Sequence, residues 1–594
     1  MVENAKDKEG AGFHPAPSSL VNGLLVLPED GKEARKIFNS LPPKDQIEML
    51  LQTRGKERLR ILFLSEKPEQ LVQHLPELEI FLTVKEIGKK DAIDLISLTT
   101  PEQFQYLLDL DTWTKDRLDP ERVLRWMEIL LESGEEKVIQ FIQSSDLEWI
   151  ALLLKKSLLV TVPEGEPLEA MDQAPPFTLD QYYFIWFKGK TAREVLQPFL
   201  QIFRHVDEDG YRRLMEALIR ELESELEETG YRFRRGRLAD YGFPDFEEAL
   251  EIYRFVHPDS LAPAERLLEM SPRKEPEKPD PVFYLAFREE GPFLSSMLSR
   301  VDDPIEQGRL KGELAALCNM AMVAEAIDLF NVGEMERMVK KVFHYLNLGL
   351  QYLSKEEEGR AIGLLTSMPL QRVFQAGVGA TLLLRKKAES ILKGPWFGGE
   401  RENLHFLDSP HFERMEGVLS RRPALHRNGL VEEFKSLQDL NDTADLLNRV
   451  EVLIRVIGGT LHLSPATLKE WDLTDCHPGE WEQITFSTIV LTSFANLILK
   501  GSFRFEAISK ACLRDFFSAV FERDEQGRGT LRMEMRKRLK DWLDSIEGDE
   551  TRRQHLHAFQ DFCFDLLEEG YGKIPPEEEI DPRFVKGLLV CNRP

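Results

Sequence analysis

Residue types that could do chemistry are concentrated in one stretch of the sequence, between Arg220 and His257. Glu223 and Glu227 lie four positions apart, which places both carboxylates on one face of a helix, as in helical metal sites. Such sites also use a Glu-x-x-His motif, and no histidine occurs between His205 and His257. The spacing therefore predicts surface charge that pairs with arginine, and it predicts neither a metal site nor a cofactor.

Four arginines with aromatic residues between them follow these carboxylates: Arg232, Arg234, Arg235 and Arg237. Gly230 precedes them, and glycine favours the left-handed conformation that ends many helices. A helix that stops at Gly230 would place its acidic last turns beside an arginine loop, and bidentate contacts would neutralise the charge. The same arginines are candidates for binding a phosphate or single-stranded RNA through charge and stacking.

A second helix is expected after the arginine loop. Asp245 and Glu248 are three positions apart, which is the spacing of a capping box at a helix start. His257 stands before a proline, which disfavours further helix. The whole segment is therefore predicted to be a helix, an arginine loop and a helix that together fix a central domain.

The elements that would position this segment are mostly helices, because apolar residues recur every three or four positions along most of the chain. The runs SLLVTV at 157–162 and YYFIWF at 182–187 are exceptions that predict a small β-hairpin, and Val282–Phe287 could add a third strand. The uncharged stretch Gln483–Leu499 contains several hydroxyl and amide side chains. Its length and polarity favour a buried core helix over a membrane span.

The composition and the positions of proline- and glycine-rich breaks predict a mainly α, multi-domain chain. The expected parts are a flexible tail at 1–30, a repeat-like helical domain at 31–160 that forms a superhelix of right-handed type, a central domain at 161–270 with the small β element, a proline- and charge-rich linker at 271–281, and a C-terminal helical domain at 282–594 with a possible subdivision near 394–430.

Net charge and cysteine usage restrict the partners and the compartment. The formal charge of −26 argues against a general affinity for nucleic acid or for anionic membranes. The five cysteines form no CxxC pair, as is usual in a reducing compartment, where isolated cysteines are mostly small buried apolar residues. The N-terminus has no apolar core of signal-peptide type. We therefore expect a cytoplasmic protein without membrane insertion.

Two segments share a proline-marked helix start followed by leucines, LPPKDQIEMLL at 41–51 and LTTPEQFQYLL at 98–108. Over residues 30–160 this pattern resembles the repeated helical units of the cytosolic N-terminal domain of MgtE-type magnesium transporters, and no site residue is carried over from them. The whole chain, and RLADYGFPDFEEALEIY at 237–253 in particular, is similar to an uncharacterised family of bacterial proteins known only as a domain of unknown function.

Three functions stay open at this stage. The favoured hypothesis is a non-catalytic scaffold or regulatory module that binds another protein, because stacked helical repeats commonly present such surfaces. The second is an enzyme of unrecognised type, with Glu223, Glu227 and Asp240 as candidate catalytic residues. The third is RNA or nucleotide-anion binding by the arginine loop, although the net charge makes nucleic acid a disfavoured partner.

Overall fold

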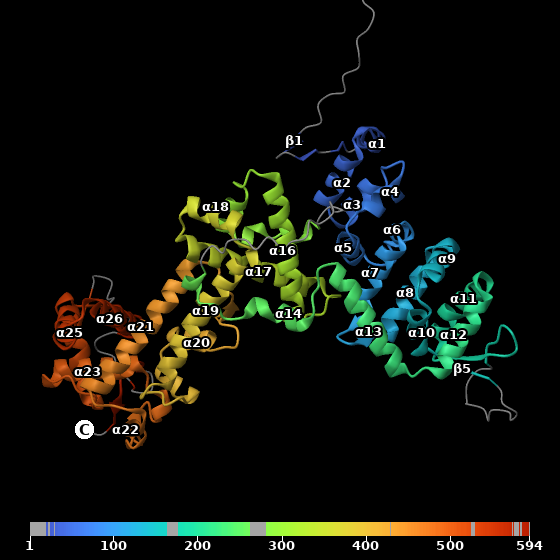
Figure 1. Cartoon of the computed structure of the whole chain (residues 1–594). Coiled ribbons are helices and arrows are strands. Elements are labelled where there is room, and N and C mark those ends of the chain that lie inside the picture. The colour runs from blue at the N-terminus through green and yellow to red at the C-terminus, as the bar shows by residue number, and fades with distance from the viewer. Residues whose placement is uncertain are drawn as a thin grey trace, which may run out of the picture. The chain divides into compact units, whose positions relative to one another are not determined.

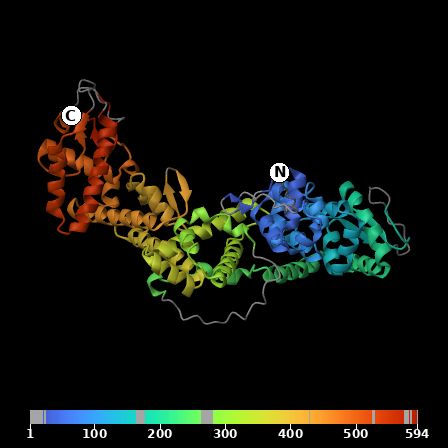
Figure 2. The same ribbon diagram turned by 90° about the horizontal axis from the view of Figure 1, so that it is seen from above.

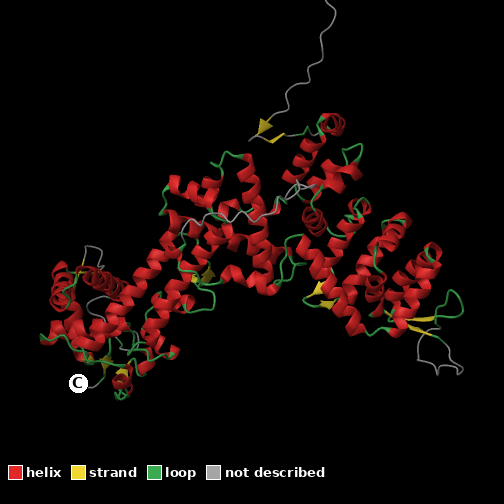
Figure 3. Cartoon of the chain, in the orientation of Figure 1, coloured by secondary structure: helices red, strands yellow, loops and turns green. Residues whose placement is uncertain are grey.

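The computed structural model describes residues 20–21, 24–25, 27–28, 30–162, 176–261, 281–427, 429–523, 529–572, 574, 581 and 585–592. Apart from Pro281, the predicted linker at 271–281 lies outside these residues. The described chain is mainly α-helical, and its strands are short (Figure 3). This confirms the predicted fold class of a mainly α chain with a small β element.

Contacts divide the chain into two compact units, and both are discontinuous in sequence. Unit 1 comprises Met1–Ile252, Leu267–Arg288 and Asp303–Val342. Unit 2 comprises Tyr253–Arg266, Glu289–Asp302 and Phe343–Pro594. The domain boundaries that composition suggests stay predictions.

Helices of unit 1 pack mainly on helices one to three places away along the chain, so that they follow one another in space (Figures 1 and 2). They are α1 (Gly31–Ser40), α2 (Pro43–Gln52), α3 (Gly55–Leu62), α4 (Pro68–His74), α5 (Glu77–Ile87), α6 (Ile93–Ser97), α7 (Pro101–Asp111), α8 (Pro120–Glu132), α9 (Glu135–Ser144), α10 (Leu147–Lys155), α11 (Lys190–Val206), α12 (Glu208–Arg220), α13 (Glu223–Asp240), α14 (Phe246–Leu250) and α16 (Pro304–Ala324). In this arrangement α13 contacts both α7 and α10.

Prolines mark several helix starts in unit 1, as the sequence predicts. α2, α4, α7 and α8 each begin at a proline, whose missing N–H would have no partner at that position. At α7 the hydroxyl of Thr100 accepts from the backbone N–H of Gln103, whose side chain accepts from the N–H of Thr100. This capping box fixes the start of the helix that later carries Asp109.

Short hairpins complete unit 1. β5 (Leu158–Thr161) pairs antiparallel with β6 (Phe184–Phe187), which confirms the predicted hairpin. β3 (Trp113–Thr114) pairs with β4 (Arg117–Leu118) across a tight turn, and β1 (Leu20–Val21) pairs with β2 (Leu24–Leu25). The predicted strand at 282–287 is wrong: Phe283–Leu285 is a 3₁₀ turn. There the backbone N–H of Phe283 donates to the buried Glu79 carboxylate at 2.8 Å.

The predicted helix, loop and helix around the arginines are wrong, because α13 runs without a break from Glu223 to Asp240. The chain is instead extended at Glu221 and Leu222, between α12 and α13. Two acidic residues therefore lie in the first turn of α13 and Arg237 lies in its last, which is the order that the helix dipole favours.

Gly230 lies inside α13 and has a different role from the predicted helix stop. A Cβ atom at this position would come within 2.4 Å of Cδ2 of Leu152 in α10. The missing side chain thus allows α13 and α10 to approach closely.

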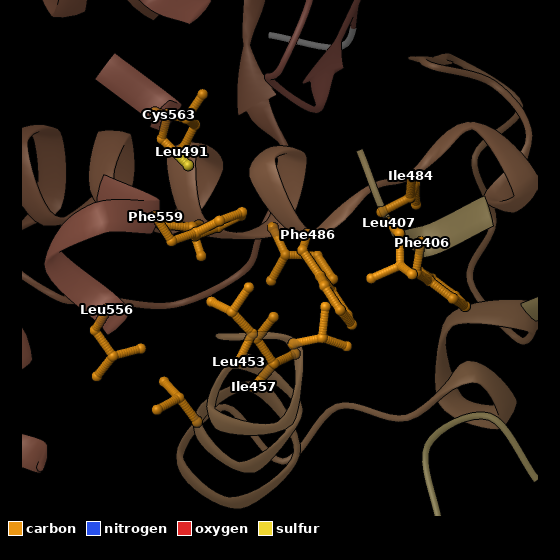
Figure 4. Close-up of a cluster of buried hydrophobic side chains, with 14 of the residues drawn as sticks. Phe406, Leu407, Leu453, Ile457, Ile484, Phe486, Leu491, Leu556, Phe559 and Cys563 are labelled. Atoms are coloured by element: carbon orange, nitrogen blue, oxygen red, sulfur yellow. The ribbon is translucent and has the colours of Figure 1, made fainter. Parts of the chain in front are cut away.

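Unit 2 contains the remaining helices, and those from α19 onward share one apolar core. They are α15 (Pro292–Leu298), α18 (Glu358–Ser367), α19 (Leu370–Lys393), α20 (His411–Val418), α21 (Leu437–Thr460), α22 (Pro465–Lys469), α23 (Phe486–Lys500), α24 (Leu513–Val520), α25 (Met533–Ile546) and α26 (Glu550–Tyr571). α17 (Val332–Ser354) contains the boundary between the units. Figure 4 shows side chains of α21, α23 and α26, among them Leu453, Phe486 and Phe559, gathered in this core.

α23 confirms the predicted core helix, because its residues 486–496 are buried. Two of its hydroxyl groups bond in different ways: Ser493 donates to the carbonyl of Ile489 in the same helix, and Thr492 accepts from the N–H of the distant Leu589. No helix in the described part of the chain has the length and apolarity needed to cross a membrane.

Unit 2 also has short strands. β7 (Leu425–Arg427) pairs with β8 (Leu430–Glu432), β11 (Phe521–Arg523) pairs with β12 (Gly529–Leu531), and β13 (Val590–Cys591) lies between β10 (Ile508–Ser509) and β9 (Cys476–His477). Cys476 and Cys591 are opposite each other in β9 and β13 and form a disulfide. The expectation of isolated cysteines is therefore wrong for this pair, whose members are 115 positions apart in sequence.

Candidate functional site

α13 turns one face toward the interior of unit 1. Its buried residues recur every four positions, at Leu226, Gly230, Arg234 and Leu238, which is the spacing of a single helix face. An arginine thus occupies a position that would ordinarily be apolar. Arg237, one turn after Arg234, is half-buried beside the same face.

Asp109, near the end of α7, receives both of these arginines. Its carboxylate is buried and accepts two bonds from Arg237, one from Nε at 2.7 Å and one from Nη2 at 2.8 Å. Its backbone carbonyl accepts from Nε of Arg234 at 2.6 Å. Burial raises the pKa of Asp109, and the two arginines oppose this shift. For Arg237, burial lowers the pKa, but the bonds to Asp109 outweigh burial and raise it.

Arg234 is held less completely than Arg237. Only 8% of its surface is exposed, and its two terminal nitrogens make no hydrogen bond to any residue that the structure describes. Burial lowers the pKa of this guanidinium, whereas the neighbouring Asp109 favours the charged form. Arg234 is therefore a nearly buried cation with unused donors.

Aromatic rings from other elements lie beside two arginines of α13. The guanidinium of Arg234 lies 5.6 Å from the ring centre of Trp113, and that of Arg237 lies 5.6 Å from Trp149. The two indoles stack with centres 6.2 Å apart and planes inclined by 11°. Tyr231 extends the group, 5.9 Å from Trp113. These rings supply cation–π contacts, but they cannot accept the in-plane N–H bonds of Arg234.

A pocket of about 670 Å³ opens beside Arg234 and Trp113. Its walls are the turn between β3 and β4, residues 231–238 of α13, the segment 243–247, and residues 322–329 at and after the end of α16. The volume lies within the range that small-molecule sites occupy. Segments from three distant parts of the sequence therefore build one pocket within unit 1.

Residues 35–591 match the family described as "Family of unknown function (DUF6178)". The chain belongs to this family. The match confirms the similarity to an uncharacterised family, whereas the resemblance to MgtE-type transporters is not shown. No curated protein and no solved structure matches the chain.

The other two arginines of this DUF6178 chain lie at the surface of α13. Arg235 lines the pocket and forms an ion pair with Asp245, and both side chains are exposed. The predicted capping box at Asp245 is wrong, because its carboxylate makes no capping bond to α14 and contacts Arg235 instead. Arg232 is exposed and does not line the pocket.

The candidate catalytic carboxylates lie elsewhere on α13. Glu227 accepts from the backbone N–H of Leu118 at 2.8 Å and from Lys156 at 2.6 Å, and Glu223 lies 3.8 Å from Lys156. The expected pairing of these glutamates with the arginines is therefore wrong. Asp240 is exposed, and none of the three carboxylates lines the pocket. A catalytic role for them stays a prediction.

Sequence reasoning missed Asp109, Trp113 and the wall at 322–329. One signal was present: Asp109 and Asp111 interrupt the apolar run Leu107–Trp113, and two carboxylates on a buried helix need cationic partners. The Asp111 carboxylate forms an ion pair with Nζ of Lys85 at 2.6 Å, and the Asp109 carboxylate forms one with Arg237. Among the described residues, no group of three or more His, Cys, Asp or Glu is placed to hold a metal.

Proposed function

We propose that the chain works by binding, and that unit 1 binds an anionic group in the pocket at Arg234. The observation that supports this proposal is the state of that guanidinium, which is 8% exposed, borders the pocket and uses only Nε in a hydrogen bond. Neither terminal nitrogen is a fully buried orphan, so each can exchange water for an oxygen of a ligand. A carboxylate or phosphate oxygen in the pocket would supply the missing acceptors.

The contrast with Arg237 strengthens this argument. Arg237 lies on the same helix and meets Asp109 through two bonds, so it already has the partner that holds α13 to α7. Arg234, which lines the pocket, adds one bond to a carbonyl, and its terminal nitrogens have no acceptor among the described residues. If packing alone were required, a side chain such as methionine would fill the position without the cost of a buried charge.

A scaffold or regulatory role through a protein partner is the second candidate. Phe246 borders the pocket with 49% of its surface exposed, and Phe233 on α13 is 48% exposed. Aromatic side chains at this exposure are typical of surfaces that a protein partner covers. RNA binding by the arginines has less support, because Arg237 bonds to the buried Asp109 and Arg235 pairs with Asp245.

The test compares Arg234→Met with Arg232→Met in the full chain. Arg232 is the matched control, because it is exposed on the same helix and lies outside the pocket lining. Benzoate and inorganic phosphate, each titrated to tens of millimolar at constant ionic strength, are the probes. We expect at least one of them to raise the thermal midpoint of the wild type and of Arg232→Met, because a ligand that binds only the folded state stabilises it.

The same probe should leave the midpoint of Arg234→Met unchanged. Hydrogen exchange across α7 and α13 would establish that this variant keeps the native packing. Equal stabilisation of both variants, or of none of the three proteins, contradicts the proposal.

A further inference from the structure

The charges around the pocket differ in sign with depth. Arg234, the cation with unused donors, is nearly buried. The carboxylates of Asp116, Asp245 and Glu247 are on exposed residues, and Asp328 is half-buried. Lys115 and Arg235 are also exposed, so the rim carries four carboxylates against two cations and is negative on balance, whereas the inner wall is positive.

The balance of these charges does not favour a simple anion. Asp245 is already paired with Arg235, so the remaining lining cations are Arg234 and Lys115. Against them stand three carboxylates, on Asp116, Glu247 and Asp328. An anion that reaches Arg234 must pass a rim of its own sign, whereas a ligand that also carries a cationic group is attracted at both ends.

The lining also sets the shape and apolarity of the ligand. The buried Trp113 and Phe243, the half-buried Tyr231 and the exposed Phe246 contribute aromatic surface to the lining. Aromatic rings stack on planar groups, and their faces also attract ammonium ions. A pocket of about 670 Å³ is large enough for a ring system together with its charged groups.

We propose that the pocket binds an aromatic α-amino acid, whose carboxylate contacts Arg234, whose ring lies against Trp113 and Tyr231, and whose ammonium group lies toward Glu247 and Asp328. This inference rests on the proposed anion site and names its ligand class. The negative rim acts as the selective element, because it favours the zwitterion over the corresponding carboxylic acid anion.

Isothermal titration of the full chain with matched ligands tests the inference. Each of L-tryptophan, L-tyrosine and L-phenylalanine is compared with the analogue that lacks the amino group and the analogue that lacks the carboxylate; for tryptophan these are indole-3-propionate and tryptamine. We expect at least one amino acid to bind tenfold or more tightly than both of its analogues. Variation of the ligand keeps the test valid even if a protein variant fails to fold.

Two variants locate the binding. Arg234→Met should abolish binding of the amino acid and of its deaminated analogue. The double variant Glu247→Gln, Asp328→Asn should remove most of the tenfold preference while leaving the deaminated analogue bound.

The possible outcomes separate the two proposals. Equal affinity for the amino acid and its deaminated analogue, both lost in Arg234→Met, overturns the inference and leaves the anion site standing. An amino acid that binds unchanged in Arg234→Met, or binding of benzoate or phosphate with none of the amino acids, also overturns it. If none of these compounds binds, the inference and the proposed function fall together.

Discussion

Units 1 and 2 hold a long helix against its neighbours by different means. In unit 1, α13 carries Arg234 and Arg237 against Asp109 and two indoles. In unit 2, α23 buries apolar side chains such as Phe494, and its hydroxyl groups bond to a carbonyl of the same helix or to distant residues such as Leu589. Apolar packing has no directional requirement, whereas a buried charge cluster needs acceptors in fixed directions. The comparison teaches that the charge cluster of unit 1 includes a guanidinium, that of Arg234, whose terminal donors remain available to a ligand.

The largest expected effect concerns the apolar helix. Phe494 is fully buried, and its ring centre lies 6.4 Å from Phe516 and 5.5 Å from Phe564. Phe494→Ala should lower the free energy of unfolding of unit 2 by ~4 kcal/mol, because it removes burial and leaves a cavity. Chemical denaturation with hydrogen exchange of α23 and α26 peptides measures this. A loss below ~1 kcal/mol would show that the core refills the space.

Removal of the charge partner in unit 1 should cost somewhat less. Asp109→Ala leaves Arg237 without its carboxylate, and breaking a buried pair in this way costs ~3 kcal/mol or more. Hydrogen exchange of α7 and α13 should increase, while that of α23 stays unchanged. Asp240→Ala, at an exposed position at the end of α13, is the control and should change stability by less than ~0.5 kcal/mol. Equal effects of the two variants would contradict the difference between the units.

Unit 2 should also respond to pH, through His411 on α20. Burial, together with Arg449 and Arg414, lowers the pKa of His411 to about 4 from an ordinary value of 6.5. Because the pKa of His411 is lower in the folded than in the unfolded chain, the neutral imidazole stabilises the folded state above pH 6.5. This stabilisation is lost as the pH falls toward 4. Between pH 7.5 and pH 5 this loss amounts to ~2 kcal/mol.

His411→Phe should flatten that pH dependence, because it removes the titrating group while keeping a ring beside Phe559 and Phe562. Denaturation of the wild type and the variant at both pH values measures the difference. His74→Phe, at an exposed position, serves as the control and should keep the pH dependence of stability seen in the wild type. An unchanged slope in His411→Phe would assign the pH response to other groups.

The smallest expected effect distinguishes two glycines of α13. At Gly230 an added Cβ would meet Leu152, whereas nothing lies within 4 Å at Gly236. Gly236→Ala should stabilise unit 1 by ~0.5–1 kcal/mol through helix propensity alone. Gly230→Ala gains the same propensity but must displace the buried side chain of Leu152, so it should destabilise by ~1 kcal/mol. Thermal unfolding of both variants measures the two stability changes. If Gly230→Ala were stabilising, Leu152 would have room to move away from the added methyl group.

The sequence predicted elements whose causes are local. The hairpin at 158–161 and 184–187 followed from β-branched and aromatic runs, and the helix at 486–500 from its uncharged apolar pattern. Local signals also misled: Gly230 was taken as a helix stop, although its cause is a neighbour 78 positions earlier, Leu152. A glycine that permits close approach and one that ends a helix are identical within a window of sequence.

The candidate site was only half predictable for the same reason. Arg234, Arg235 and Arg237 were found by their charge, but their partners depend on which distant segments meet α13. Asp109 lies 125 positions before Arg234, and the wall at 322–329 comes after the predicted linker. Apolar periodicity says that a face is buried, and it does not say which carbonyl or carboxylate will be opposite.

The wall at residues 322–329 has a practical consequence for anyone who divides the gene. A polypeptide that ends at Leu261 would keep every arginine of α13, together with Asp109 and Trp113, and would still lack the segment that closes the pocket at Met322 and Ile327. Ligand screens on such a piece would sample an open groove with different selectivity. The smallest unit in which to look for the ligand therefore extends through Val342, past the proline-rich segment at which a boundary would naturally be drawn.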